Sequence, residues 1–462
     1  MSTLIRGGTV IKGSGDTVIE GGAVVIRDGR IADVLDIRGA DPWGADRDFA
    51  GDVIDASGCV VMPGLINSHT HGVTPGALFP SAAPALTEER WMGNLDRHLL
   101  AGTTTVLSLC GFASMDDVRE ADRRHAVHVR GATTHLPHCL QAAGMADGQG
   151  LTAEARELTV ERMLLDGAVA IGELGGGQTL GGGGQDLVYI PAAIHKVSGI
   201  LITIDQARRI KEAVLGRFID AAALNVVALA EAAKEAGLAE AFTATQLAKL
   251  VTDSVMPSFV PAIEGIREGV QAAAKFGVPA IVHSASATAG VLRELMFELD
   301  GGEATVIAAH ANHPSHTPDE ARELAVLGRK MGWPAEASVF DLLHRKHTVT
   351  TREHWDLLLR EPDLISVIGT DYGHDGDHDE LISAVQDIAA FGHRSLAGAV
   401  AMATSAVAGL IPGIAPASGR LEAGCIADVV VARADDLRDV RFVLVEGVCV
   451  VRDGQLTPEA HR

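Results

Sequence analysis

Cysteine is scarce in this sequence, and its pattern argues against a disulfide framework. The 462 residues contain five cysteines, which are odd in number, widely separated and free of any Cys-x-x-Cys pair. Disulfide-stapled domains normally carry an even set of cysteines at short spacings. We therefore expect free thiols, buried in a protein of the reducing cytoplasm, at Cys59, Cys110, Cys139, Cys425 and Cys449.

Long apolar runs and an excess of positive charge are also missing. No stretch of about 18 uncharged apolar residues occurs, which argues against a membrane span. Residues Met1 to Thr9 lack the basic start and apolar core of a signal peptide, so we expect a cytoplasmic location. The formal net charge of −22 repels phosphate backbones and anionic lipids. We therefore expect no nucleic-acid or membrane partner, but a small-molecule substrate and a homo-oligomer, either dimer or tetramer.

Apolar residues are plentiful, and their pattern changes along the chain. They make up 47% of the sequence against 21% charged residues, which is enough for a large core and a second domain. Both ends consist of short β-rich runs separated by turn signals such as Asp28-Gly29 and Asp453-Gly454. Neither end alone has enough strands to bury an apolar face. We expect residues 1–63 and 406–462 to form one small β-sandwich beside a central domain of residues 64–405.

The central domain alternates buried-looking strands with helical stretches. Continuous apolar runs are typical of parallel strands that are covered on both faces. Eight such runs occur, and together with the helices they predict an α/β fold with a (β/α)₈ barrel. A helical insertion at about residues 205–255 separates the fourth and fifth strands and could be a lid, a decoration or an oligomer contact. The expected strands are Gly64–His69, Thr103–Leu109, His128–Thr134, Ala168–Glu173, Ala280–His283, Thr305–His310, Ala335–Phe340 and Ile365–Thr370.

Side chains that can bind metal ions lie at the C-terminal ends of five of these strands. Barrel enzymes keep their catalytic groups at this end. A lone His-x-His is a weak signal among 19 histidines, but five strand ends in order are a strong one. The predicted ligands are, in chain order, His69, His71, Glu173, His283, His310 and Asp371.

Five segments resemble the amidohydrolase superfamily of metal-dependent hydrolases. Residues 61–71, VMPGLINSHTH, resemble its opening signature, and residues 101–105, AGTTT, resemble its second strand. Residues 419–431, GRLEAGCIADVVV, resemble the segment in which its chains re-enter the sandwich, and the strands at either end match as well. The resemblance covers nearly the whole chain apart from the helical insertion. It implies that His69, His71 and Asp371 hold one divalent ion, and that His283 and His310 hold a second.

The fourth strand departs from the pattern of this superfamily. Many members bridge the two ions with a carboxylated lysine, but residues 167–176, GAVAIGELGG, contain no lysine and place Glu173 there. A glutamate carboxylate carries the same charge as the carboxylated lysine, so it can bridge two ions in its place. A site with one ion, in which Glu173 is a supporting acid, is the alternative. The Gly-Glu pair before a Gly-rich turn, together with His310-Ala311-Asn312, is similar to the enamidase branch, which opens a cyclic enamide.

The resemblance implies hydrolysis of a non-peptide C–N bond, with a cyclic amide, lactam or enamide as the expected substrate. A divalent ion lowers the pKa of a bound water from about 15.7 to about 7 and polarises the carbonyl. Asp371 would accept the proton of that water and pass it to the leaving nitrogen, unless it is a plain ligand. Imidazole and carboxylate ligands accept zinc, iron, cobalt or manganese, and we expect two zinc ions.

Polar residues that follow the third, sixth and eighth strands face the same end of the barrel. Each could bind a carbonyl or carboxylate of the substrate, or could support the loop that carries it. These candidates are His135, His138, Asn312, His313, Tyr372 and His374. The acidic loop around His374 could also be a solvated loop or an additional ion site.

Three other functions compete with amide hydrolysis. A deaminase of a ring amidine usually carries an additional acid near the fifth strand, whereas Ser284-Ala285-Ser286-Ala287 follow His283 here. A urea or thiocarbamate hydrolase would use the same ligands. A non-catalytic assembly protein of the same superfamily typically lacks metal ligands, and here all six positions are filled.

Overall fold

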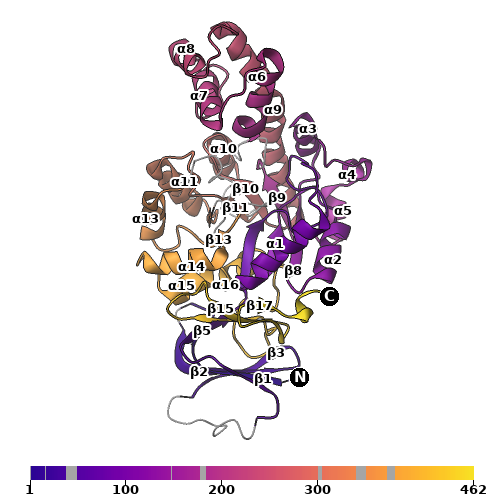
Figure 1. Ribbon diagram of the computed structural model, residues 1–462, viewed down its shortest axis with the longest axis vertical. Coiled ribbons are helices and arrows are strands. Elements are labelled where there is room, and N and C mark those ends of the chain that lie inside the picture. The colour runs from indigo at the N-terminus through magenta and orange to yellow at the C-terminus, as the bar shows by residue number, and fades with distance from the viewer. Residues whose placement is uncertain are drawn as a thin grey trace.

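In the computed structural model the chain builds three parts along one long axis (Figure 1). A β-sheet lies at one end, a barrel occupies the middle and a helical cap forms the other end. The structure describes residues 2–15, 17–37, 49–146, 148–176, 184–299, 304–339, 350–371 and 380–462.

Eight parallel strands form the barrel, and the predicted α/β fold class is confirmed. Six of them pair in sequence order from β6 to β11, and β12 pairs with β13. A parallel bridge between Ala308 and Ala335 joins the two sheets, and the amide of Asp371 donates to the carbonyl of His69 at 3.0 Å to close the ring. The strands are β6 (Leu65–Thr70), β7 (Thr103–Ser108), β8 (His128–Thr133), β9 (Ala170–Leu174), β10 (Ala280–His283), β11 (Val306–Ala309), β12 (Glu336–Ser338) and β13 (Val367–Gly369).

Helices cover the outside of the barrel, and apolar side chains fill its inside. Ile66, Ile281, Ile307 and Val367 meet in the interior and pack against Val407 of α16, as in the packed centre of other barrels. The covering helices are α1 (Glu88–Leu100), α2 (Met115–Arg124), α3 (Pro137–Ala146), α4 (Ala153–Glu157), α5 (Val160–Leu165), α10 (Ala289–Glu298), α11 (Pro318–Lys330), α13 (Arg352–Arg360), α14 (Leu381–Ala390), α15 (Leu396–Met402) and α16 (Ser405–Leu410).

Strands from both ends of the chain form one continuous nine-stranded sheet. This sheet stands where the sequence predicts a small β-sandwich built from both ends. The two ends join where β5 and β14 pair antiparallel, with Met62 opposite Val430. Asp28 and Gly29 have φ values of +48° and +77°, as a two-residue hairpin turn requires. The strands are β1 (Ser2–Ile11), β2 (Val18–Arg27), β3 (Arg30–Asp36), β4 (Asp52–Asp55), β5 (Cys59–Pro63), β14 (Val429–Arg433), β15 (Val440–Val445), β16 (Val448–Arg452) and β17 (Gln455–Leu456).

Deletion of residues 418–462 is expected to give insoluble protein. The deletion removes β14 to β17 and leaves β5 as an unpaired apolar edge, which is a template for aggregation. The soluble fraction after expression measures the effect. A control deletion of residues 457–462 keeps every strand of the sheet and should stay soluble. A soluble and folded protein from the longer deletion would contradict the shared sheet.

The helical insertion forms the cap, and it begins earlier than predicted. It starts at Gln185 rather than at about residue 205, and it has its own apolar core around Ile194, Ile210, Leu229 and Leu247. Its elements are η1 (Gln185–Tyr189), α6 (Ile190–Ser198), α7 (Ile204–Leu215), α8 (Val226–Glu235) and the first half of α9 (Ala244–Phe276). The second half of α9 runs down beside the barrel.

Arg217 ties the cap to the mouth of the barrel. Its guanidinium donates to the carbonyl of Ser315 at 2.8 Å and to Glu320 Oε2 at 2.6 Å. The hydroxyl of Ser286 donates in turn to the carbonyl of Arg217 at 2.9 Å. Ser286 follows β10 and Ser315 follows β11, so the cap contacts the loops that leave two strands of the barrel.

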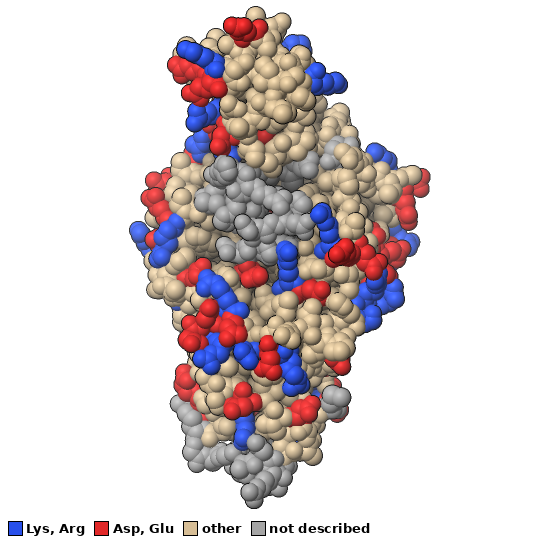
Figure 2. All heavy atoms as spheres, viewed as in Figure 1, with Lys and Arg blue, Asp and Glu red and all other residues tan. Residues whose placement is uncertain are grey.

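Among the helices within the described ranges, none is long and apolar enough to cross a membrane. On the face shown in Figure 2, Lys and Arg side chains lie among Asp and Glu side chains and do not gather into an extended basic area.

Candidate metal centre

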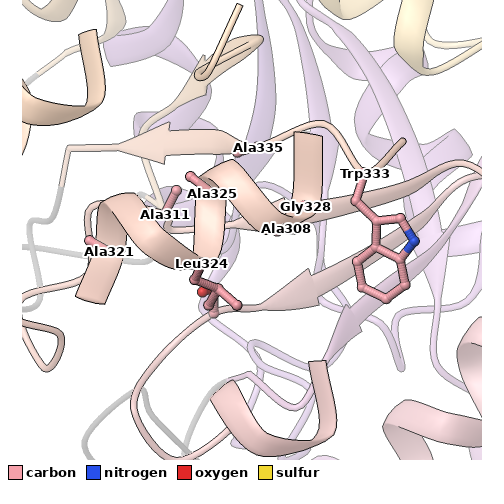
Figure 3. Close-up of a pocket in the computed structure, with 9 residues that line it drawn as sticks. Ala308, Ala311, Ala321, Leu324, Ala325, Gly328, Trp333 and Ala335 are labelled. Atoms are coloured by element: carbon pink, nitrogen blue, oxygen red, sulfur yellow. The ribbon is translucent and has the colours of Figure 1, made fainter. Parts of the chain in front are cut away.

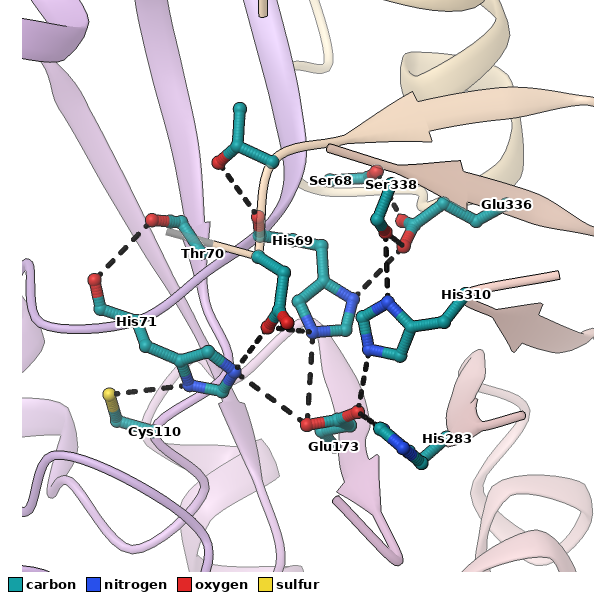
Figure 4. Close-up of polar contacts among 12 residues, drawn as sticks. Ser68, His69, Thr70, His71, Cys110, Glu173, His283, His310, Glu336 and Ser338 are labelled. Atoms are coloured by element: carbon teal, nitrogen blue, oxygen red, sulfur yellow. Dashed lines mark hydrogen bonds and ion pairs between the residues drawn. The ribbon is translucent and has the colours of Figure 1, made fainter. Parts of the chain in front are cut away.

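The C-terminal ends of five barrel strands bring all six predicted ligands together (Figure 4). His69, Glu173 and His283 lie on β6, β9 and β10, and the other three ligands follow β6, β11 and β13. Five of the six are buried, whereas the side chain of Asp371 is 15% exposed. Asp371 is therefore the ligand candidate nearest to solvent.

The carboxylate of Glu173 lies at the centre of the cluster, and its two oxygens face different histidines. Oε1 lies 2.6 Å from His283 Nδ1 and 2.9 Å from His310 Nε2. Oε2 lies 3.6 Å from His71 Nε2 and 3.8 Å from His69 Nε2. The cluster thus divides into two half-sites that share one carboxylate.

Asp371 lies beside His69 and His71. Its Oδ1 lies 3.3 Å from His71 Nε2 and 3.5 Å from His69 Nε2. We name the group of His69, His71 and Asp371 the first half-site, and the pair His283 and His310 the second half-site. This division agrees with the ligand sets that the resemblance implies.

Backbone geometry places several of these side chains. His310 and Asp371 have φ values of +59° and +55°. Residues other than glycine rarely adopt such values, and those that do often lie at functional sites. Gly176 leaves room for the central carboxylate, because a Cβ atom there would lie 1.9 Å from Glu173 Oε2.

The charges of the cluster are mutually stabilised. Burial alone would raise the pKa of Glu173, but His283 and His69 outweigh it and hold the pKa well below its usual value. Burial would lower the pKa of His69, but Glu336 and Glu173 raise it to about 10. The cluster therefore keeps its carboxylates ionised and attracts positive charge.

These residues fit divalent metal ions. His69 Nε2 is buried without a hydrogen-bond partner among the described residues, and it points at two carboxylates. Two groups of three ligand atoms close enough to hold an ion, one with His69, His71 and Glu173 and one with Glu173, His283 and His310, share Glu173. Imidazole and carboxylate donors in this ratio suit zinc and its neighbours.

Glu336 and Ser338 of β12 are site residues that the sequence interpretation missed. Glu336 Oε1 accepts from His69 Nδ1 at 3.0 Å, and Ser338 Oγ lies 2.9 Å from His310 Nδ1. Glu336 is fully buried. An acidic residue within a predicted buried strand was the available signal, because a buried carboxylate needs a partner.

Cys110 lies against another ligand. Its Sγ is 3.7 Å from His71 Nδ1 and accepts from the amide of Gly72 at 3.3 Å. All five cysteines are free, as expected. Cys59 and Cys110 are buried, but the other three are partly exposed, so the expectation of burial holds for two of the five.

Two of the predicted substrate-binding residues lie in the buried surroundings of the site. His135 follows β8, and its Nε2 is buried without a hydrogen-bond partner among the described residues. Burial lowers the pKa of His135 to about 4, so its ring is neutral. The ring of His313 lies 5.4 Å from the ring of His283, and its Nδ1 bonds to the hydroxyl of Ser315 at 2.8 Å.

Two other candidates have contacts that argue against a role in binding the substrate. The amide of Asn312 donates to the carbonyl of Ser338 at 2.8 Å and accepts from its N–H at 2.9 Å, so its side chain is occupied. His138 is 41% exposed on α3 and bonds to Glu268 of α9 at 2.6 Å. Both therefore support structure in this geometry. Tyr372 and His374 lie outside the described residues.

A third histidine cluster lies away from the mouth of the barrel. Asp96 Oδ1 is 3.1 Å from His125 Nε2 and 2.7 Å from His461 Nε2. His125 Nδ1 accepts from the amide of Val127 at 3.0 Å, so the proton of the neutral ring sits on Nε2. That proton occupies the position in which an ion would need a lone pair. The cluster therefore links residues near position 461 to α1 by hydrogen bonds.

The cavity in Figure 3 is not the substrate site. It lies between α11 and the strands β11 and β12, has a volume of about 10 Å³ and is lined mainly by alanine, Leu324 and Trp333. Sites for small molecules usually measure about 300 to 1,000 Å³ and carry convergent polar groups.

Sequence comparison identifies the family. The model of the Amidohydrolase family matches residues 60–456. A 5'-deoxyadenosine deaminase from Methanothermobacter thermautotrophicus is 38% identical over 93 residues, which cover 20% of this chain and 19% of the deaminase. An allantoinase from Escherichia coli is 38% identical over 73 residues, which cover 16% of this chain and 14% of the allantoinase. The matched segments thus span less than a fifth of either relative.

Solved structures share the fold over the whole chain. The β-aspartyl dipeptidase of Fervidobacterium islandicum has a TM-score of 0.56 at 13% identity, covering 99% of this chain and 98% of that one. The dihydropyrimidinase of Brevibacillus agri has a TM-score of 0.56 at 14% identity, covering 100% and 97%. These likenesses support the fold alone. With the family match over residues 60–456 and the buried histidine–carboxylate cluster at the strand ends, the chain belongs to the amidohydrolase family as a metal-dependent member.

Proposed function

We propose that the protein hydrolyses a non-peptide C–N bond with two divalent ions, most simply zinc, and opens a cyclic amide, lactam or enamide. The observation that carries this proposal is the central carboxylate, whose two oxygens face two separate histidine pairs. His69, His71 and Asp371 would hold one ion, His283 and His310 the other, and Glu173 would bridge them. When bound there, the ions would supply a water of lowered pKa and polarise the substrate carbonyl.

Asp371 is the residue that we assign to proton transfer. Burial alone would raise its pKa, but His310, His71 and His69 outweigh burial and lower the pKa, so the carboxylate is ionised at neutral pH. Its partial exposure supports this role, because a substrate and a water would reach the cluster from solvent. It can therefore take a proton from the attacking water and return it to the leaving nitrogen.

The residues after β10 support amide opening over deamination. Ser284, Ala285 and Ser286 stand there, and none is an acid that could protonate a ring nitrogen. The hydroxyl of Ser284 lies 3.5 Å from His316 Nε2, and that of Ser286 is bonded to the cap. An enamide substrate, as in the enamidase branch, is the narrowest form of this proposal.

A turnover screen tests the proposed reaction. Purified protein is offered cyclic amides, lactams, enamides, ureas, ring amidines and dipeptides, with the Asp371→Asn variant as background. From a cyclic amide or lactam we expect one product that is heavier than the substrate by one water, without release of ammonia. A cyclic enamide would instead open to an enamine, which takes up a second water and gives a carbonyl product and ammonia. Stoichiometric ammonia from a ring amidine would establish a deaminase, and cleavage of a dipeptide into two amino acids would establish a peptidase. Either result would contradict the proposal.

A further inference from the structure

We propose that Glu336 and Ser338 form a positioning relay that fixes one histidine of each half-site through a single buried carboxylate. Both residues lie on β12, on the other side of the His69 and His310 rings from Glu173 (Figure 4). The inference rests on the proposed two-ion site, but it does not depend on which substrate is hydrolysed.

The first step of the relay joins Glu336 to His69. An ionised carboxylate can only accept hydrogen bonds, so the 3.0 Å contact to Oε1 places the ring proton of His69 on Nδ1. In the neutral form of the ring, which is the form that binds a metal ion, the lone pair then lies on Nε2, which faces Glu173 and Asp371. A carboxylate behind a histidine ligand also makes the ligand a better donor.

The second step reaches the other half-site through a hydroxyl group. Ser338 Oγ donates to Glu336 Oε1 at 3.2 Å. Because the hydroxyl proton is used in this way, Oγ accepts from His310 Nδ1 at 2.9 Å. The lone pair of His310 then lies on Nε2, 2.9 Å from Glu173 Oε1. The direction of every proton in the relay thus follows from the charge of Glu336.

The surroundings hold the relay in place. Glu336 Oε2 accepts a hydrogen bond from the hydroxyl of Ser68 at 2.5 Å. The side-chain amide of Asn312 forms hydrogen bonds with both the carbonyl and the N–H of Ser338. Gly369 permits the close approach, because a Cβ atom there would lie 2.7 Å from the Cβ of His69 and 3.2 Å from the carboxyl carbon of Glu336. These contacts hold the carboxylate of Glu336 in one orientation.

The other two histidines have different partners. His71 Nδ1 faces the sulfur of Cys110, and His283 Nε2 has no hydrogen-bond partner among the described residues. The relay therefore contacts one imidazole in each half-site. Glu336, His69 and His310 are also close enough to hold an ion themselves. Such an ion would need the Nδ1 lone pairs, and the rings would then turn protonated Nε2 atoms toward Glu173, so the two arrangements exclude each other.

The test is a Zn²⁺ titration of metal-free protein against a chromogenic chelator, with four proteins in parallel. Glu336→Gln keeps the size of the side chain and removes its charge, and we expect both affinities to fall about tenfold to 100-fold. Ser338→Ala cuts only the branch to His310, and we expect one of the two affinities to fall about tenfold while the other is unchanged. Ser258→Ala is the matched control, because Ser258 is also buried but, among the described residues, its hydroxyl bonds to Val255 of its own helix and not to the metal cluster. Thermal melting of each metal-free protein verifies folding.

Each other outcome contradicts the relay. An unchanged Glu336→Gln, or a Ser338→Ala variant in which both affinities fall equally or neither falls, would overturn it. Three ions in the wild type and two in Glu336→Gln would make Glu336 a ligand instead. A wild type that binds one ion would overturn the two-ion site and this inference together, whereas two ions with unshifted variants would overturn the relay alone.

Discussion

His69→Ala and His283→Ala are each expected to lose one ion, and the two variants should lose different ions. The reason is the division of the cluster, in which the two histidines face different oxygens of Glu173. Both variants should lose about 10³-fold or more in turnover, because the ions supply several kcal/mol of transition-state stabilisation. Asp371→Asn should lose turnover as well, since it removes both a ligand charge and the proton acceptor.

Double variants show which ion each residue holds. His69→Ala combined with His71→Ala should bind one ion, like either single variant, whereas His69→Ala combined with His283→Ala should bind none. Metal content of purified protein measures both. His138→Ala is the matched control and should keep two ions, because His138 contacts Glu268 on the outside of the barrel. A His69→Ala protein with the full metal complement would show that the assignment is wrong.

Glu173→Gln is expected to weaken the binding of one ion and to lower turnover about 100-fold or more, because it removes the charge of the bridge and one of its two good donor oxygens. The substitution keeps the size of the side chain and leaves one good donor oxygen. Metal stoichiometry is the primary measurement, and turnover is the secondary one. A Glu173→Gln protein with two ions and near-normal turnover would exclude Glu173 as the bridge and would favour a one-ion site of His69, His71 and Asp371.

Glu173→Lys is the sharper form of the same test. It restores the residue that many members of the superfamily carboxylate, so added bicarbonate could rebuild a bridging carboxylate. We expect partial rescue of metal binding at most, since the carboxylated side chain is longer than glutamate and Gly176 leaves little space around Oε2. The same titration without bicarbonate is the control. Rescue that does not depend on bicarbonate would argue against this explanation.

The elements that carry the site were the most predictable from sequence. β10 has the predicted bounds Ala280–His283, and the runs before Glu173 and Asp371 form strands within a few residues of those expected. Continuous apolar runs between helices are best explained as parallel barrel strands, because both faces of such a strand are buried. The order of the ligands along the chain therefore followed from the strand ends.

The supporting residues were harder to predict. Asn312 follows a strand as a substrate-binding residue would, yet both ends of its amide are taken by the backbone of Ser338, a residue 26 positions away. Glu336 acts through His69, which lies 267 positions away. Such contacts come from the register between strands, which a single sequence does not contain. The early start of the cap at Gln185 was missed because its apolar residues pack against later helices rather than against the barrel.

Reconstitution of metal-free protein with zinc tests the central claim most directly. Metal-free protein is titrated with Zn²⁺, and bound metal and turnover of the substrate found in the screen are measured at each step. The account predicts that binding saturates at two ions per chain and that turnover reaches its plateau only when the second ion is bound. A plateau of both binding and turnover at one ion per chain would contradict it.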